Sequence, residues 1–298
     1  MIISELSCKD GDFNMSRIDK KFAELGKRGE AALIPFVTAG DPDLDTTLEI
    51  LRALDKSGAD CIELGIPFSD PTADGPTIQR SSERALKSGV SLRAIFRTIS
   101  EFRRDSEVPL ILFGYYNPFL RYGLREVCRQ AARAGVDGML CVDLPPEESD
   151  ELKGWAEAAG LDLIFLLSPT SDIERIRLVG KSGRGFIYYV SVTGVTGARR
   201  SFDDRLRSQV TRVRRMTGLP VAVGFGVSTP KQAAWIAGFA DAVVVGSALV
   251  ETIEKAQGSA VKARHAGAFI GSLKRAARTV RRKVSRRAVP KPERRIVL

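Results

Sequence analysis

The chain has 298 residues, of which 44% are hydrophobic and 28% are charged, a composition typical of a globular protein that dissolves in water. It has no apolar run near the roughly 20 residues that a membrane-spanning helix needs. Its first residues, MIISELSCKDGDFN, lack the basic start and apolar core of a signal peptide. We therefore expect a cytoplasmic protein, long enough for one large α/β barrel or two ordinary domains.

The net charge of +10 lies at the carboxyl end of the sequence. Residues 274–298 hold eleven Lys or Arg and one acid, Glu293, whereas the remaining 273 residues hold 35 basic and 35 acidic side chains. The segment RRKVSRRAVPKPERR is dense in charge, broken by proline and poor in aromatics, so we expect residues 281–298 to form a disordered basic tail. Such a tail could hold RNA or anionic lipid non-specifically, although a solvated tail is the simpler interpretation.

Metal and thiol chemistry are both disfavoured. Four cysteines, Cys8, Cys61, Cys128 and Cys141, form no CxxC pair, and the single histidine, His265, lies in a C-terminal helical region. Without a histidine cluster or a cysteine pair the sequence predicts no metal site. No histidine is placed to activate a cysteine nucleophile, so we expect reduced thiols, most of them buried.

Eight short apolar runs alternate with amphipathic helical stretches along the chain, which predicts a parallel sheet covered by helices. Eight such units in about 250 residues match a closed (β/α)₈ TIM barrel. A doubly wound open sheet is the alternative, but no GxGxxG motif follows the first run. The predicted strands cover residues 31–39, 61–67, 108–116, 138–144, 161–168, 185–192, 220–225 and 241–246.

The barrel is expected to occupy residues 16–280, with an extra N-terminal helix and the basic C-terminal tail outside the eight repeats. Residues 1–15 form a loose extension in this interpretation, and Met15–Lys27 a helix that closes the bottom of the barrel. Two of the predicted helices, LDTTLEILRALDKSG and PEESDELKGWAEAAG, each end at a glycine, which is the usual residue just beyond a helix terminus.

Glu63 is the most unusual residue of the second strand. Side chains alternate along a strand, so Cys61, Glu63 and Gly65 share one face while Ile62, Leu64 and Ile66 share the other. The apolar face suits the helix layer, which turns Glu63 into the barrel near its catalytic, C-terminal mouth. No basic residue lies inside any predicted strand to pair with it. Because an unpaired buried carboxylate is costly, we interpret Glu63 as functional.

With metal and thiol chemistry disfavoured, acid–base chemistry by carboxylates is the expected mechanism. No lysine stands at the C-terminal end of a strand, so a Schiff-base aldolase is not expected. Glu63 would act together with Asp70 or Asp74 on the loop that follows.

Glycine-rich turns after the last strands predict a phosphate site. Gly224 and Gly226 follow strand seven, and Gly246 and Ser247 stand where strand eight enters a short helix. Loops in these places, with a helix N-terminus, commonly hold phosphate in barrel enzymes. A third loop, SVTGVTGARR at 191–200, is long enough to act as a lid.

The motif ELGIPFSDPTADGPTIQ, with PFVTAGDPD before it and YYVSVTGVTGAR, GFGVST and VGSALV after it, resembles the tryptophan synthase α subunit family. The resemblance runs from about Ser16 to Val280. It implies retro-aldol cleavage of indole-3-glycerol phosphate to indole and glyceraldehyde 3-phosphate. It also implies an α₂β₂ complex in which indole passes to a β subunit, and in which pyridoxal phosphate belongs to that β subunit and no cofactor to this chain.

The resemblance also implies roles for individual residues. Glu63 would transfer protons and Asp74 would accept the indole N–H, while Asp70 would organise the loop and the subunit interface. Thr196 would bond the Asp74 carboxylate when the lid closes. The indole pocket would be built from Phe36, Leu112, Tyr115, Leu140 and Tyr188, and the phosphate site from Gly197, Phe225, Gly226, Gly246 and Ser247.

Two residues depart from the family pattern. Thr72 stands where leucine is usual, and Val192 where arginine is common; both bear on loop closure. There are three rival interpretations: a free-standing lyase, a barrel that serves mainly as a binding partner, and a protein that binds nucleic acid through its tail. The intact Glu63 and Asp74 disfavour the second, and the neutral barrel disfavours the third.

Overall fold

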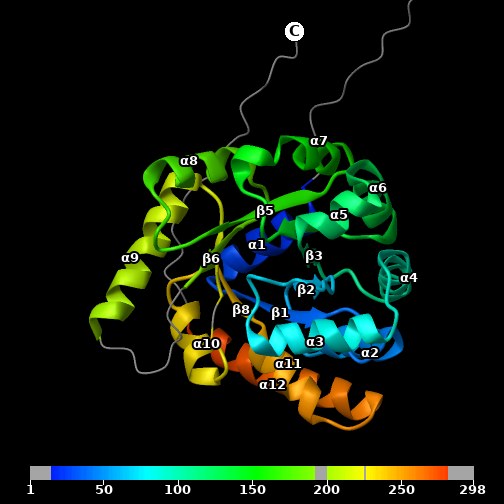
Figure 1. Ribbon diagram of the computed structural model, residues 1–298. Helices are drawn as coiled ribbons and strands as arrows, with labels where there is room; N and C mark the ends of the chain where they lie inside the picture. The colour runs from blue at the N-terminus through cyan, green and yellow to red at the C-terminus, as the bar shows by residue number, and fades with distance from the viewer. Residues whose placement is uncertain (1–14, 192–199, 225, 281–298) are drawn as a thin grey trace, which may run out of the picture.

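The computed structural model describes residues 15–191, 200–224 and 226–280, with no account of the side chains of 200–204. Eight parallel strands close into a barrel in the order β1 to β8, which confirms the predicted (β/α)₈ fold (Figure 1). The strands are β1 Ala32–Thr38, β2 Ile62–Gly65, β3 Leu110–Gly114, β4 Gly138–Cys141, β5 Asp162–Leu167, β6 Ile187–Val190, β7 Val221–Gly224 and β8 Ala242–Val245.

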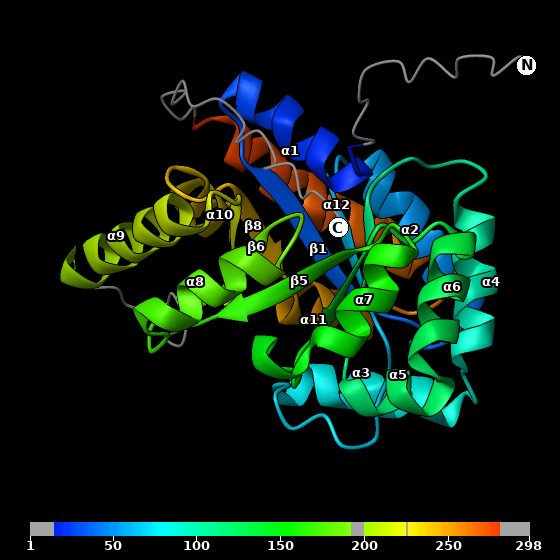
Figure 2. The same cartoon turned by 90° about the horizontal axis from the view of Figure 1, so that it is seen from above.

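Helices surround the barrel and connect its strands. Those on one side, α2, α4, α6 and α7, follow one another around the wall, while α8 and α9 pack together on another side (Figure 2). The helices are α1 Arg17–Arg28, α2 Leu44–Lys56, α3 Pro76–Lys87, α4 Leu92–Phe102, α5 Tyr116–Tyr122, α6 Leu124–Ala134, α7 Asp150–Ala158, α8 Ile173–Ser182, α9 Arg200–Thr217, α10 Pro230–Ala237, α11 Ser247–Lys255 and α12 Ser259–Arg278, with a short 3₁₀ turn at Pro146–Glu148.

Each predicted strand is present, although all are shorter than the apolar runs that predicted them. One difference follows β3, where the run was expected to continue to residue 116. The strand ends at Gly114 and α5 begins at Tyr116. The aromatic side chains extended the apolar pattern beyond the strand.

Helix α1 closes the amino end of the barrel, as the sequence predicted for Met15–Lys27. Its Ile18 is fully buried in the apolar cluster that fills the barrel interior, and the rings of Phe22 and Phe186 are 5.4 Å apart. The Ser16 hydroxyl accepts the Asp19 N–H as the N-cap and donates to Asp162 at 2.6 Å. The predictions for residues 1–14 and 281–298 lie outside the described residues.

Two large apolar clusters form most of the core. One lies between the strands and the surrounding helices and contains Ile62 and Leu64 of β2. The other fills the barrel and contains Cys61, Ile111 and Leu140. The predicted division of β2 into an outward apolar face and an inward face with Glu63 is therefore confirmed. Across the described part of the chain, no helix is long and apolar enough to cross a membrane.

Candidate active site

Glu63 lies inside the barrel at the level of two other inward-facing side chains. In the strand register it is paired with Phe36 of β1 and with Ile111 of β3. Neighbouring residues at one level of a parallel barrel point the same way, and the layer around Glu63 is apolar. The side chain is 0% exposed.

Within the described part of the chain, the Glu63 carboxyl has no partner for its charge. Neither of its oxygens has a hydrogen-bond partner among the residues that the structure describes. Burial raises the pKa of this carboxyl to about 8, because the charged form loses its hydration and gains nothing in return. At neutral pH Glu63 is therefore mostly protonated, which makes it an acid able to give up a proton inside an apolar pocket.

Asp74 reaches the same region from the loop between β2 and α3. Its carboxylate accepts a hydrogen bond from the Tyr115 hydroxyl, which opposes the rise in its pKa that partial burial causes. The Tyr115 oxygen in turn accepts the Ala73 N–H at 3.0 Å. The Gln79 side chain donates to the Asp74 carbonyl at 2.8 Å. Tyr115 thus holds the Asp74 carboxylate, and Gln79 holds the backbone of the same residue.

The charges of both carboxylates act on one tyrosine. Burial first, and then the charges of Glu63 and Asp74, raise the pKa of the Tyr188 phenol well above its usual value. Tyr188 therefore lies within electrostatic range of both. Gly224 leaves space for it, since a Cβ on this glycine would stand 2.4 Å from the Tyr188 hydroxyl oxygen.

Aromatic rings line the mouth above Glu63. The rings of Phe36 and Phe113 are 5.2 Å apart and edge-on, and those of Phe113 and Tyr188 are 6.4 Å apart. Phe113 and Tyr188 are only partly buried, and Leu140, the register partner of Phe113, is fully buried in the same interior cluster. This set offers the flat apolar surface that an indole ring requires.

Leu112 does not belong to this pocket, which corrects the expectation from the sequence. It is paired with Leu64 and packs in the outer cluster beneath the helices. The reason is strand alternation, because Leu112 is one residue out of phase with the inward Ile111 and Phe113. Phe113 is the residue that sequence reasoning missed. Phe113 and Tyr115 are two residues apart, so alternation along the strand places them on one face, and this signal could have identified Phe113.

The predicted phosphate residues that the structure describes lie at one side of the mouth. Gly226 has a φ of +72°, a conformation that glycine adopts at little cost. Gly246 precedes α11 without any side-chain cap for the helix, and the first turn of α11 holds no acid. Its exposed first residue is Ser247. Free N–H groups at such a terminus attract anions. Val192, Thr196, Gly197 and Phe225 lie outside the described residues.

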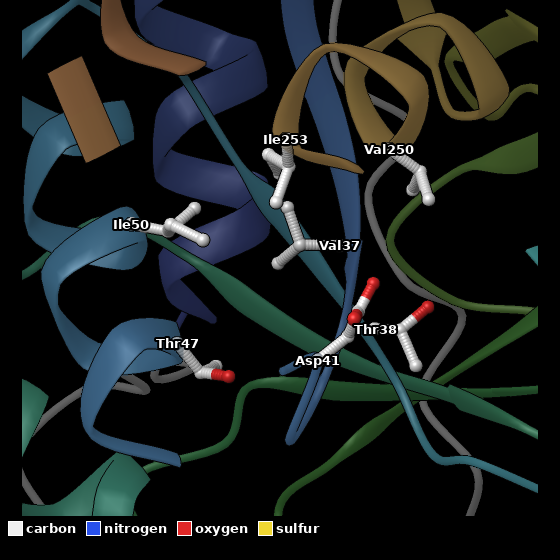
Figure 3. Close-up of a pocket in the computed structure, with 7 residues that line it drawn as sticks. All are labelled: Val37, Thr38, Asp41, Thr47, Ile50, Val250 and Ile253. Carbon is white, nitrogen blue, oxygen red and sulfur yellow. The ribbon is translucent and has the colours of Figure 1, made fainter. Parts of the chain in front are cut away.

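A small cavity of about 10 Å³ is lined by residues of β1, the turn after it, α2 and α11, and by none of the aromatic residues at the mouth (Figure 3). Such a volume admits one water at most, so it cannot hold a substrate. It separates the end of β1 from α2 and α11, and its lining comprises Val37, Thr38, Asp41, Thr47, Ile50, Val250 and Ile253. No group of metal-ligating side chains occurs within the described ranges.

Fold and site together fit one class: a TIM-barrel enzyme whose mouth offers two carboxyls, aromatic rings and a helix start open to an anion. The family profile described as "Tryptophan synthase alpha chain" matches residues 22–278. The tryptophan synthase alpha chain of Citrifermentans bemidjiense is 57% identical over 260 residues, covering 87% of this chain and 97% of that protein. The corresponding chain of Geobacter sp. strain M21 is 56% identical over the same length and the same shares.

Solved structures agree with this similarity. The crystal structure of tryptophan synthase subunit alpha from Legionella pneumophila superposes with a TM-score of 0.84 at 40% identity, covering 89% of this chain and all of that one. This chain belongs to the tryptophan synthase alpha chain family. It is a carbon–carbon lyase of tryptophan biosynthesis that cleaves indole-3-glycerol phosphate.

Proposed function

We propose that Glu63 carries both proton transfers of the cleavage and that Asp74 stabilises the indole ring while they occur. The observation that carries this proposal is the buried carboxyl of Glu63, which lacks a hydrogen-bond partner within the described residues and has a pKa of about 8. Such a group is protonated at neutral pH, yet its conjugate base is strong enough to remove a proton afterwards.

The reaction requires a proton at indole C3. Protonated Glu63 donates it, and the resulting positive charge on the ring nitrogen is stabilised by the Asp74 carboxylate, which accepts the ring N–H. The ionised Glu63 then takes the proton from the hydroxyl on the adjacent side-chain carbon. As that oxygen becomes the aldehyde, the bond from its carbon to C3 breaks and its electron pair restores the neutral indole. Glu63 ends protonated, ready for another turnover.

The indole ring would lie among Phe36, Phe113 and Tyr188, with Leu140 beneath. Tyr115 acts through Asp74, since its hydroxyl holds that carboxylate. The phosphate would bind at Gly226, Gly246 and Ser247, where the uncapped start of α11 favours an anion. Gly197 and Phe225 would complete that site, and Thr196 would contact Asp74 from the lid.

Glu63→Gln tests the proton transfers directly. The variant keeps the shape of the side chain but cannot give up or accept the proton, so indole release should fall by about two to four orders of magnitude. Affinity for an unreactive substrate analogue should stay within a few-fold of the wild type. Near wild-type turnover in this variant would remove Glu63 from the mechanism.

A β subunit is the proposed partner, in an α₂β₂ assembly that binds pyridoxal phosphate in the β chains and receives indole from this one. Solved relatives at 35% identity, with a TM-score of 0.80, include tryptophan synthase from M. tuberculosis. Two exposed features at the catalytic end support a docking face: the loop with Asp70 and Thr72, and Leu120 of α5, which is 50% exposed. The expected location of the complex is the cytoplasm.

Co-elution with a cognate β subunit in size-exclusion chromatography tests this partner. Wild type should shift to the mass of an α₂β₂ complex, and Leu120→Asp should shift less because it places a charge at an apolar contact. Elution of wild type as a monomer at micromolar concentrations of both chains would favour the free-standing lyase instead.

A further inference from the structure

One face of α3 joins the two ends of the candidate active site. Near the start of this helix Ile78 packs with Phe36 of β1 and Val250 of α11 in a separate apolar cluster. One turn later the Ser81 hydroxyl lies 2.7 Å from that of Thr38, at the end of β1. These positions are three residues apart, so they lie on the same face of the helix. The face is turned toward β1 and α11.

Arg84 completes this face with the strongest polar contacts on α3. Its guanidinium donates two hydrogen bonds to the Asp41 carboxylate, each 2.7 Å long, and a third to Glu254 of α11 at 2.6 Å. Asp41 is buried, with 7% of its side chain exposed. A two-pronged arginine–carboxylate contact fixes direction as well as distance. Arg84 therefore holds α3, the β1–α2 turn and α11 in one arrangement.

The elements held by Arg84 carry different parts of the site. Helix α3 starts two residues after Asp74, and its Gln79 side chain bonds the Asp74 carbonyl at 2.8 Å. Helix α11 starts at Ser247, in the proposed phosphate site. The two helices pack side by side (Figure 1). Figure 3 shows Asp41 beside Thr38, between side chains of α2 and α11.

We propose that Arg84 is a positioning residue that sets the spacing between the phosphate site on α11 and the Asp74 carboxylate on the α3 loop. This inference rests on the proposed function, because it assumes that one substrate spans both places. A ligand held at both ends gains affinity only when the two sites stand at the distance its own skeleton requires. Arg84 supplies that fixed distance without touching the substrate.

A purely structural role makes a different prediction. If Arg84 only stabilised the fold, its loss would weaken every ligand alike or none at all. If it sets the spacing, its loss weakens ligands that span both sites and leaves ligands of one site nearly unchanged. The distinction needs three probes: indole, glycerol 3-phosphate, and an indole joined to phosphate through an unreactive propyl chain.

Calorimetric titration of the full chain with these probes is the test. In Arg84→Met, the affinity for the spanning analogue should fall by about tenfold or more, since small misplacements of bound groups have effects of up to roughly a hundredfold. Affinity for each half should change less than twofold. Arg84→Lys keeps a charge beside Asp41 but loses the fork; it should show the same selective loss to a smaller extent, and it decides the matter if Arg84→Met does not fold.

Arg80→Met is the matched control. Arg80 lies on the same helix and contacts the same Glu254, at 3.1 Å, but is 49% exposed and does not contact Asp41. It should leave all three affinities within twofold. Equal losses for the three probes in the Arg84 variants, or no loss for the spanning analogue, would overturn the inference alone. Failure of glycerol 3-phosphate to compete with the spanning analogue in wild type would overturn the proposed phosphate site and the inference with it.

Discussion

The aspartates at the amino end of the barrel differ from Glu63, which lies toward the carboxyl end. At the amino end, aspartates stand at or just before the start of a strand, and each has partners. Asp60 pairs with Lys274, Asp137 with Arg103 and Arg17, Asp162 with the Ser16 hydroxyl and Asp241 with Arg214. At the carboxyl end, the Glu63 oxygens have no hydrogen-bond partner among the described residues.

Three of the amino-end aspartates follow one structural rule. Asp60, Asp137 and Asp241 precede β2, β4 and β8, and each accepts a backbone N–H from the start of the preceding strand. These bonds run from the N–H groups of Leu33, Leu110 and Val221 and are 2.7, 2.8 and 2.9 Å long. Each aspartate thereby joins two strands and a cation carried by a helix. Their contribution is to the closure of the barrel.

Several groups at the carboxyl end of the barrel lack interaction partners within the described residues or remain partly exposed. Glu63 is buried without a charge partner among the described residues, Gly246 gives α11 no side-chain cap, and Phe113 and Tyr188 remain partly exposed. Polar groups without a partner and partly exposed aromatic rings are available to contact a substrate. The difference teaches that a carboxyl without a partner among the described residues is kept at the catalytic end, whereas the aspartates at the opposite end are paired, which agrees with the position of active sites in barrels.

Removing a cation from the amino end should have the largest effect on stability. Arg103 is nearly buried and donates to Asp137 and to the carbonyls of Gly135 and Val108. Arg103→Met should lower the free energy of unfolding by about 3–5 kcal/mol, the usual consequence of leaving a buried charge short of its partner. Denaturant unfolding measures this change.

The control for Arg103 is its neighbour. Arg104 is 73% exposed in its pair with Glu101, so Arg104→Met should change the same quantity by less than about 1 kcal/mol. Cleavage by the folded fraction of Arg103→Met should equal that of wild type. A loss of turnover per folded molecule would break the separation between the two ends.

Changing the second carboxylate of the mouth should have a smaller effect, confined to activity. Asp74→Asn keeps the size of the side chain but weakens its hold on the indole N–H. We expect kcat/KM for cleavage to fall roughly 10- to 100-fold, the loss associated with one hydrogen bond to a charged group. Glu83→Gln, the same kind of change at an exposed position of α3, should leave the rate unaltered. Equal rates in the two variants would contradict the role of Asp74.

Sequence reasoning reached the fold and Glu63 because both depend on local pattern. Alternation along β2 was enough to turn Glu63 inward, and the absence of a basic residue in the strands was visible without a structure. The same rule applied to β3 gives Phe113 in place of Leu112, so that error came from placing Leu112 and Tyr115, which differ in phase, in one pocket.

The ion pairs at the amino end and the contacts of α3 could not be predicted from local sequence pattern. Lys274 and Asp60 are 214 residues apart in sequence, and Arg84 and Glu254 are 170 apart. Nothing in the neighbourhood of either partner indicates the other, because these pairs form only when the barrel closes. The hydrogen bond from Tyr115 to Asp74 also joins residues that are distant in sequence. The place of Tyr115 in the chain predicts burial but not the direction of its hydroxyl.

The central claim is that the fold buries the Glu63 carboxyl without a partner among the described residues, and the pH dependence of stability tests it most directly. The pKa of this carboxyl is about 8 in the folded chain against an ordinary value of 4.5. Between these values the folded chain keeps the proton that the unfolded chain has lost. Folding then takes up a proton, so stability falls as the pH rises from about 4.5 to 8 and is level above.

The measurement is the free energy of unfolding of wild type and Glu63→Gln in denaturant at pH 5 and pH 8. The amide that replaces the carboxyl in this variant does not titrate, so the difference between the two proteins isolates the carboxyl. We predict that wild type loses roughly 3–4 kcal/mol relative to the variant between these pH values. A difference that stays constant with pH, or one that changes in favour of wild type, would show that the Glu63 carboxyl is solvated or paired and would contradict the account.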